Sequence, residues 1–529
     1  MLLFCENFKS MVKTFGSAVH GISATTVTVE VHIGQGINFY LVGLPDSAVK
    51  ESHQRIDAAL KNNNLKIPGK QITINMAPAD IRKEGSAYDL TIAVGILAAS
   101  EQIKSDEIDK YIIMGELSLD GELRPIKGTL PIAIKAKQEG FKGLIIPEEN
   151  AKEAAVVDGL EVYGVSTIKQ VIGFFNETLT LEKTTINIEQ EFLTRLDDFE
   201  CDFLDVKGQE NIKRALEIAA SGGHNVILIG PPGAGKTMLS KRMPSILPPL
   251  TLDEALETTK IHSVAGRTTK TAGLVTKRPF RSPHHTISDV ALVGGGMNAQ
   301  PGEISLAHNG VLFLDELPEF SAQVLDSLRQ PLENGEAVIS RANRHVRYPS
   351  RFQLIAAANP CKCGGGPGAF QCRKGPACQA SYFSRISGPF LDRIDLFVDV
   401  AQVTATDLGL PAPVEGTAEA AVRVFAARER QSKRYGESDA RRRAVNADTP
   451  GSEIEALCRL DESARALVAK AAEQMALSAR AYYRVLKVAR TIADLDGATT
   501  VARVHAAEAL TYRFRPAMAT RTSASGIVA

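Results

Sequence analysis

A glycine-rich stretch near the middle of the chain has the residue types needed to hold a chain of phosphates. It matches the pattern G-x-x-x-x-G-K-[ST] and consists of Gly230, Pro231, Pro232, Gly233, Ala234, Gly235, Lys236 and Thr237. The glycines let backbone N–H groups wrap the phosphates, Lys236 reaches the β and γ phosphates, and the Thr237 hydroxyl ligates Mg²⁺. The apolar run Val226–Ile229 precedes it, which is the context this motif requires. The stretch therefore predicts a site for ATP and Mg²⁺.

Polar side chains end two later apolar runs. Asp315 and Glu316 follow the run Val311–Leu314, and Asn359 follows the run Phe352–Ala358. Asp315 is expected to hold Mg²⁺, and Glu316 is expected to act as general base toward the attacking water. Asn359 is expected to line up that water, with a simple turn asparagine before a proline as the alternative. Together with the glycine-rich stretch, these residues predict hydrolysis of ATP.

Arginines further along the chain are candidates for stabilising charge on the γ-phosphate. Arg393 stands in the segment Ser387–Leu396, where ATPases of the AAA+ class place a residue that reaches into a neighbouring subunit. We expect Arg393 to be this arginine finger, with Arg385 as the second candidate and a local salt bridge as the alternative. Arg480 begins a predicted helix and is expected to touch the γ-phosphate within the same chain. Arg484, one turn later, is the alternative.

Four of the 7 cysteines follow Asn359 closely, in the spacing C-x-C-x8-C-x5-C; they are Cys361, Cys363, Cys372 and Cys378. Four thiolates in a short glycine-rich loop suit a tetrahedral Zn²⁺ ion, and such clustering is not typical of a disulfide framework. The spacing is not that of a standard zinc finger, so a metal-free insertion is the alternative. The adjacent pair His284 and His285 has no third ligand nearby, and we interpret it as structural.

The segment Ile339–Arg347 has the pattern of a turn and the second strand of a hairpin. Arg341, Arg344 and Arg347 are expected to cluster at or near its tip. Arginines in such a place bind phosphates without reading bases, so they are candidate DNA contacts. An ordinary solvated basic hairpin is the alternative.

The bulk composition limits the class of protein. A length of 529 residues suggests about three or four domains. Hydrophobic content of 44% and charged content of 23% are those of an ordinary soluble globular protein. The formal net charge is +0, so any binding to nucleic acid must use a local basic surface. No apolar run is long enough to span a bilayer and the N-terminus lacks a signal-peptide pattern, so we expect a cytoplasmic protein without membrane contact.

The elements that must position these residues form a multidomain α/β pattern. In the first third, β-branched runs such as Thr26–Val31 alternate with helical patterns such as Ser47–Asn62. Lysine is the common base there, whereas arginine dominates the last quarter, so the chain is either a composite or has drifted. The pattern predicts an α/β domain over 1–170, a linker over 171–203, an α/β core over 204–400, a linker over 401–416, a helical domain over 417–515 and a tail over 516–529.

Several longer motifs resemble one family in particular. They are Arg278–His285, Val293–Gly296, Pro301–Gly310 and Ser478–Asp494. Through them nearly the whole chain resembles the YifB/ComM family of magnesium-chelatase-like AAA+ ATPases. The resemblance implies a Lon-protease-like α/β domain, a P-loop α/β core and a helical C-terminal lid domain. It also implies a homo-hexamer that acts on branched or single-stranded DNA without sequence preference, as a branch-migration helicase in natural transformation.

The Lon-like domain is expected to lack peptidase activity. In the segment that resembles the Lon serine motif, the nucleophile position falls on Ala87, and Ser86 lies one position earlier. The lysine position falls on Leu130, with Lys127 nearby. Because a serine without an activating base is a weak nucleophile, we expect a degenerate scaffold, with a one-residue shift that makes Ser86 the nucleophile as the alternative. The alternative function for the whole chain is the ATPase motor subunit of a metal-chelatase-like complex.

Overall fold

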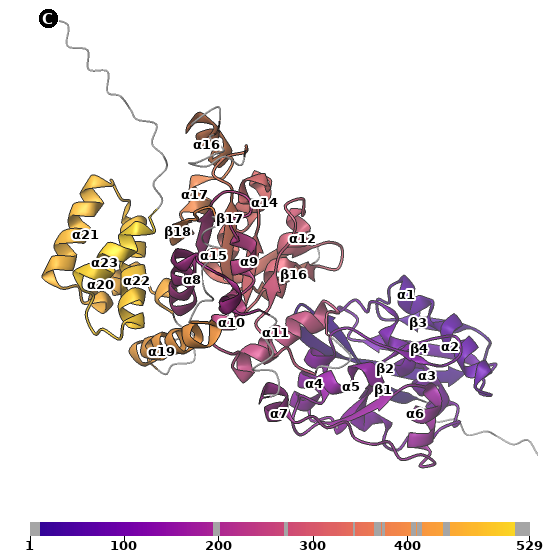
Figure 1. Ribbon diagram of the computed structural model, residues 1–529. Coiled ribbons are helices and arrows are strands. Elements are labelled where there is room, and N and C mark those ends of the chain that lie inside the picture. Colours follow the sequence, from indigo (N-terminus) through magenta and orange to yellow (C-terminus); the bar gives the residue numbers. More distant parts are fainter. Residues whose placement is uncertain are drawn as a thin grey trace, which may run out of the picture. The chain divides into compact units, whose positions relative to one another are not determined.

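Two β-sheets of different size organise the chain in the computed structural model (Figure 1). The structure describes residues 11–193, 201–268, 273–341, 344–363, 372, 376–403, 409, 415–436 and 445–513. One unit comprises Met1–Arg195, Thr251–Thr276 and Ala299–Pro301, and the other comprises Leu196–Leu250, Lys277–Asn298 and Gly302–Ala529. The mixed α/β fold class predicted from the sequence is confirmed.

The first unit is built on a seven-stranded sheet in the order β3-β4-β2-β1-β5-β8-β9. The pairs β1–β2 and β2–β4 are antiparallel, and the remaining pairs are parallel. Its strands are β1 (Val12–His20), β2 (Ser23–Gly34), β3 (Phe39–Val42), β4 (Gln71–Ala77), β5 (Tyr111–Ile113), β8 (Gly143–Pro147) and β9 (Glu161–Val165), with the small pair β6 (Glu116–Leu117) and β7 (Leu123–Arg124) beside it and β13 at Gln300–Pro301.

Helices supply the other layer of this unit. They are α1 (Ser47–Lys50), α2 (Ser52–Asn62), α3 (Asp89–Ala99), α4 (Thr129–Gln138), α5 (Glu148–Ala154), α6 (Ile168–Phe175), α7 (Ile188–Leu193) and α11 (Leu252–Val264). Every residue of α3 is buried, and α3 and α4 both contact β1 and β2. In β4, Ile72, Ile74 and Met76 are buried in strict alternation, as expected for a strand with one face on the core.

Helix α11 joins the first unit although its sequence lies between the motifs of the predicted ATPase core. The buried carboxylate of Glu153 accepts hydrogen bonds from the Leu130 N–H (2.8 Å), from the Thr268 hydroxyl (2.9 Å) and from the Ser263 hydroxyl. Burial raises the pKa of Glu153, and these hydrogen bonds oppose the shift. The predicted linker also differs from the structure, because α6 extends to Phe175 and α7 lies within it.

The second unit contains a five-stranded sheet in the order β11-β14-β17-β10-β18. All of its pairs are parallel. The strands are β10 (Val226–Ile229), β11 (Phe280–Arg281), β14 (Val311–Leu314), β17 (Gln353–Ala358) and β18 (Leu396–Asp399). The helices around them are α8 (Glu210–Gly222), α9 (Lys236–Ser240), α10 (Met243–Ile246), α12 (Asp289–Val293), α13 (Glu303–Leu306), α14 (Ala322–Ser327), α15 (Arg329–Asn334), α16 (Pro376–Phe383) and α17 (Gly388–Leu391), with β12 at Gly294–Gly295.

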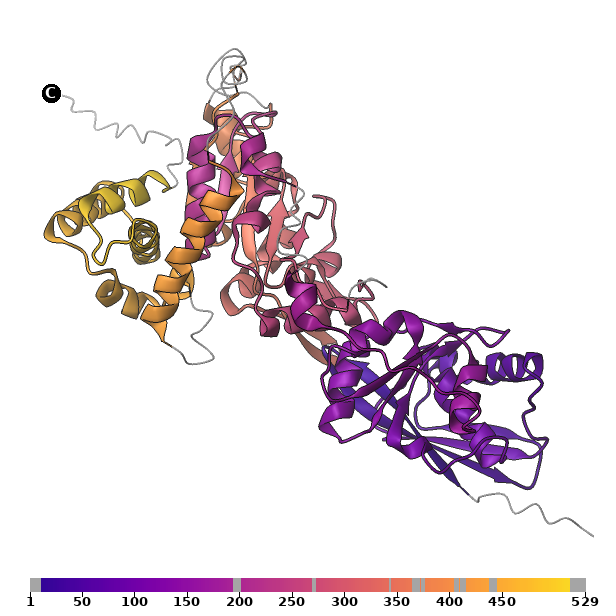
Figure 2. The same cartoon turned by 60° about the horizontal axis from the view of Figure 1, so that its bottom comes forward.

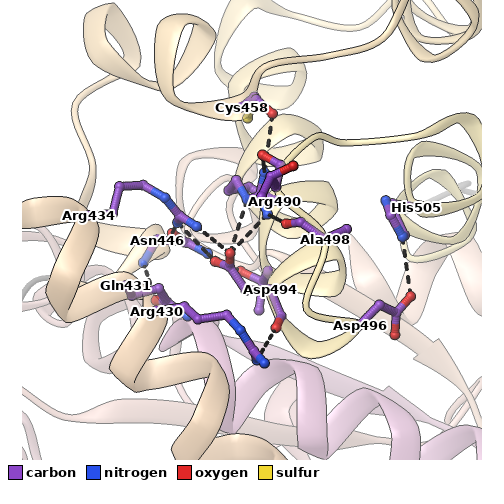
Figure 3. Close-up of polar contacts among 12 residues, drawn as sticks. Arg430, Gln431, Arg434, Asn446, Cys458, Arg490, Asp494, Asp496, Ala498 and His505 are labelled. Carbon is purple, nitrogen blue, oxygen red and sulfur yellow. Dashed lines mark hydrogen bonds and ion pairs between the residues drawn. The ribbon is translucent and has the colours of Figure 1, made fainter.

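A helical region completes this unit, and Figure 2 shows its first helix, α19 (Thr417–Tyr435), running beside α8. The other helices are α20 (Gly451–Cys458), α21 (Glu462–Gln474), α22 (Ala479–Leu495) and α23 (Arg503–Thr511). Helix α22 begins where the sequence predicted, because the Ser478 hydroxyl caps it by accepting the Ala481 N–H. Figure 3 shows a buried polar network in this region, centred on Asp494 of α22.

Candidate ATP-hydrolysis site

The phosphate loop (Gly230–Thr237) joins the carboxyl end of β10 to α9 in the second unit. Strand β10 is wholly apolar and lies between β17 and β18, so its end is held firmly at one edge of the sheet. Gly233 and Gly235 have φ values of +76° and +83°, which favour glycine over residues that carry a Cβ. The sequence thus adopts the tight turn that the motif predicts.

Lys236 points back into this loop and toward the end of the neighbouring strand β17. Its Nζ donates to the carbonyl oxygens of Gly230 (2.6 Å) and Pro231 (2.9 Å), and to Asn359 Oδ1 at 3.3 Å. Burial lowers the pKa of Lys236, and the carboxylates of Asp315 and Glu316 oppose that shift. Lys236 and Asn359, predicted from separate motifs, are therefore brought together.

Thr237 and Asp315 also meet, because β14 ends at the same edge of the sheet. The Thr237 hydroxyl donates to Asp315 Oδ2 at 2.7 Å. Both offer hard oxygen atoms of the kind that Mg²⁺ prefers. Glu316 follows with a left-handed backbone (φ +52°), a conformation that costs a non-glycine residue on the order of 1–2 kcal/mol. The Glu316 N–H donates to Asp315 Oδ1 at 2.9 Å, so the two adjacent carboxylates are held apart.

His285 also lies at this edge, and its sequence context did not indicate a place in the site. His285 Nδ1 lies 3.4 Å from Glu316 Oε2. The pair His284 and His285 was interpreted only as structural, because the contact depends on the pairing of β11 with β14. The sequence signal for His285 is its place a few positions after a strand that pairs with the strand preceding Asp315 and Glu316.

Arg393 does not join the phosphate loop of its own chain. Its backbone carbonyl accepts a hydrogen bond from Asn225 (2.9 Å), directly before β10, whereas the phosphate loop lies beyond the other end of that strand. The Arg393 side chain is 9% exposed and pairs with Glu333, not with a neighbouring aspartate. Arg385 is more exposed and pairs with Glu319 at 3.1 Å.

Arg480 and Arg484 lie with Arg393 at the amino end of the sheet. Burial lowers the pKa of Arg393, and the positive charges of Arg480 and Arg484 add to the effect. Arg484 is bound to Asp395 at 2.7 Å, and Asp395 also contacts His224 Nδ1 at 3.3 Å. Arg480 lies close to Arg393, and its expected contact with the γ-phosphate of its own chain stays a prediction.

The predicted basic hairpin is present as the antiparallel pair β15 (Glu336–Arg341) and β16 (Arg344–Pro349). The backbones of Arg341 and Arg344 face each other at its turn end, and the two residues between them lie outside the described residues. Arg347 is exposed but pairs with Val338, three positions further along the hairpin. Arg347 is thus set back from the tip, because the register was not readable from the sequence.

Three of the four clustered cysteines lie between β17 and α16 and the fourth, Cys378, lies in α16; much of the loop that joins them is outside the described residues. Their sulfur atoms, in Cys361, Cys363, Cys372 and Cys378, all lie within 4.8 Å of one another. A tetrahedral zinc site with Zn–S bonds of about 2.3 Å needs S–S separations of about 3.8 Å. Cys363 and Cys378 have that separation, 3.8 Å. Their contacts raise the pKa of Cys363 to about 11, since the clustered thiols disfavour one another's ionised forms.

The residues expected to disable a Lon-like peptidase are in the first unit. Leu130 is fully buried in α4, and Lys127 is exposed. The Ser86 hydroxyl donates to the carboxylate of Glu116 rather than to a lysine. The nearby amine of Lys83 is buried and donates to a backbone carbonyl, that of Pro78. Among the described residues, no helix is long and apolar enough to cross a membrane.

Comparison with known proteins gives matches along most of the chain. Residues 202–408 match a family model described as "Magnesium chelatase, subunit ChlI", residues 29–150 match "Subunit ChlI of Mg-chelatase", and residues 414–513 match "Magnesium chelatase, subunit ChlI C-terminal". The chain is 44% identical over 506 residues to Competence protein ComM of Haemophilus influenzae. The match covers 95% of this chain and 97% of that protein.

Two other relatives differ in how much they match. The chain is 43% identical over 502 residues to the uncharacterized protein YifB of Escherichia coli, covering 94% of this chain and 96% of that protein. It is 34% identical over 128 residues to Lon protease 2 of Bacillus subtilis, which is 24% of this chain and 22% of the protease. The likeness to Lon is therefore partial.

Proposed function

Because the chain belongs to the YifB/ComM family of magnesium-chelatase-like AAA+ ATPases, we propose that it couples ATP hydrolysis to the movement of DNA strands. The convergence of Lys236, Thr237, Asp315 and Asn359 at one edge of a parallel sheet carries the proposal. The DNA substrate is suggested by the relative named for competence, and branch migration is the activity we propose. The proposal implies a cytoplasmic location.

Each residue of the site has a role in this chemistry. Lys236 binds the β and γ phosphates of ATP, and Thr237 and Asp315 hold Mg²⁺. When bound, Mg²⁺ neutralises charge on the phosphate oxygens. Glu316 accepts the proton of the attacking water, and Asn359 hydrogen bonds that water beside the γ-phosphate. The backbone N–H groups of the phosphate loop surround the remaining phosphate oxygens.

We propose that the site is completed by a neighbouring copy in a homo-hexameric ring. Arg393 and Lys236 lie beyond opposite ends of β10, whose four residues extend over about 10 Å or more. The Arg393 guanidinium therefore serves the γ-phosphate of another chain, where it stabilises developing negative charge. Arg480, which lies in the same neighbourhood, acts on that same neighbouring site, and Arg385 is the second candidate for the finger.

The hairpin β15–β16 is the proposed DNA contact. Arg341 and Arg344 stand at its turn end and Arg347 follows on the same strand as Arg344. Their guanidinium groups bind backbone phosphates, which gives affinity without sequence preference. Such contacts suit a motor that must move along any sequence.

We further propose that the four clustered cysteines bind one structural zinc ion. Zinc would hold the loop that follows Asn359 and precedes Arg385. Purified protein is expected to contain about one equivalent of zinc per chain and to lose it in Cys363→Ser, whereas Cys201→Ser retains it. Less than about half an equivalent in the unaltered protein contradicts the site.

The proposed activity is tested by measuring ATP hydrolysis with and without branched, single-stranded and duplex DNA. Lys236→Ala is expected to abolish hydrolysis, and Arg344→Ala is expected to lose stimulation by DNA. Lys433→Ala, a change of an exposed lysine on α19, is the matched control that keeps stimulation. If none of these DNAs stimulates hydrolysis, the proposal of a DNA motor fails. That result would favour the alternative, an ATPase subunit of a metal-chelatase-like complex, as in the descriptions of the matching family models.

A further inference from the structure

His285 lies beside the residue proposed as general base. Its Nδ1 is 3.4 Å from Glu316 Oε2, and the two side chains are 30% and 51% exposed. The two residues follow adjacent parallel strands, because β11 ends at Arg281, four residues before His285, and β14 ends at Leu314, two residues before Glu316. At this distance the two groups make an ion-pair contact; because a carboxylate only accepts hydrogen bonds, Nδ1 must carry the proton for the two groups to bond. Such contacts in enzymes are often long in the free protein and shorten in the substrate complex.

The His285 ring is held in place from several sides. It stacks on the ring of His284, with centroids 4.1 Å apart, and it meets the edge of Phe320 at 6.4 Å. The turn is closed by the Ile287 N–H, which donates to the His284 carbonyl at 3.0 Å. Arg281, the last residue of β11, is anchored by two bonds to Glu303. The ring is therefore a fixed partner for a half-exposed carboxylate.

Glu316 needs such a partner. Its backbone is left-handed (φ +52°), and the carboxylate of the preceding Asp315 is bound to Thr237. The negative charge of the Glu316 carboxylate opposes the lowering of the Lys236 pKa by burial. A half-exposed glutamate has several rotamers, and a fixed donor selects one of them.

We propose that His285 is a positioning residue that keeps the Glu316 carboxylate directed toward the attacking water. The inference rests on the proposed hydrolysis of ATP. His285 does not touch ATP in this role; it acts through Glu316. Its loss lowers the turnover number and leaves nucleotide binding unchanged, since Lys236 and Thr237 make the proposed phosphate and magnesium contacts.

The test compares four forms of the full-length chain in steady-state ATP hydrolysis and in binding of a fluorescent ATP analogue with Mg²⁺. His285→Phe keeps an aromatic ring against His284 and Phe320 but removes the donor, and kcat is expected to fall roughly tenfold at unchanged KM and Kd. His285→Asn places an amide N–H near the position of Nδ1 and is expected to restore most of kcat. Lys433→Ala, a change of an exposed lysine on α19 away from this edge of the sheet, is the control and keeps kcat.

The possible results separate this inference from the function on which it rests. If the unaltered protein does not hydrolyse ATP, the proposed function fails. If it hydrolyses ATP and His285→Phe turns over at the same rate or faster, only the positioning role is overturned. Equal losses in His285→Phe and His285→Asn, or a rise in KM that accounts for the whole defect, also overturn it, because a structural role predicts those results.

Discussion

Asp494 is the centre of a buried ion network in the helical region, and its neutralisation is expected to destabilise that region strongly (Figure 3). Its side chain is fully buried and accepts from Arg434 Nη1 (2.9 Å), Arg490 Nη2 (3.0 Å) and Asn446 Nδ2 (2.9 Å). Arg490 is only 1% exposed. Asp494→Asn keeps the volume of the side chain but leaves two guanidinium groups facing a neutral amide. Breaking a buried ion pair in this way costs about 3–5 kcal/mol.

Asp496→Asn is the matched control two residues further along the chain. The Asp496 side chain is 47% exposed and contacts His505 Nε2 at 3.2 Å. Because solvent screens an exposed pair, this change is expected to cost less than about 1 kcal/mol. Figure 3 shows that both aspartates lie in the same region, so general effects of a substitution there are matched.

Amide hydrogen exchange is the appropriate assay. The chain has 0 tryptophans and more than one unit, so a single two-state unfolding curve by tryptophan fluorescence is not expected. Peptides from α19 and α22 report the local free energy of opening. A loss of 3–5 kcal/mol corresponds to protection lowered between about 100-fold and about 5,000-fold in Asp494→Asn. Equal protection in Asp494→Asn and Asp496→Asn would refute the reasoning.

Three further predictions concern other parts of the chain. Burial alone would raise the pKa of Asp395, but Arg484 and His224 lower it from 3.8 to about 2, so at pH 7 Asp395→Asn should reduce the local free energy of opening by about 2 kcal/mol in amide hydrogen exchange. The stabilisation by ionised Asp395 should disappear as the pH falls from 3.8 toward 2. An equal effect of Asp395→Asn at pH 7 and near pH 2 contradicts it. Burial raises the pKa of Glu153 above 4.5, so ionisation of this carboxyl at pH 7 weakens the first unit. Glu153→Gln should therefore raise the melting temperature of the first unit at pH 7 and make that temperature less dependent on pH. A lower melting temperature in this variant argues against the reasoning. Mixing equal amounts of inactive Arg393→Ala and Lys236→Ala chains should restore about a quarter of the hydrolysis sites, whereas no recovery excludes action on a neighbouring copy.

Local motifs allowed the centre of the site to be predicted. The phosphate loop carries its own backbone conformation in Gly233 and Gly235, and the apolar runs before Asp315 and Asn359 indicated buried strands, which the structure shows to be parallel. Parallel strands bring their carboxyl ends to one edge, so three separate motifs converge without further information. The start of α22 was also predictable, because its cap depends only on Ser478 and the residues directly after it.

Features that depend on long-range pairing were not predictable. The contact of His285 with Glu316 exists because β11 lies beside β14. Arg347 lies back from the hairpin tip because of the register in which β15 and β16 pair, and the local sequence does not determine that register. The partner of Arg393 is Glu333, which is 60 residues away in the sequence. The membership of α11 in the first unit likewise depends on the buried hydrogen bonds of Glu153.

The central claim is most directly tested by following branch migration of a fluorescently labelled four-way DNA junction in the presence of Mg²⁺ and ATP. The unaltered protein is expected to convert the junction to duplex products, and Glu316→Gln, which keeps the proposed ATP contacts but lacks the general base, is expected to leave it intact. Conversion should also require ATP. If the unaltered protein hydrolyses ATP but converts the junction no faster than Glu316→Gln, the proposed coupling of hydrolysis to DNA movement is contradicted.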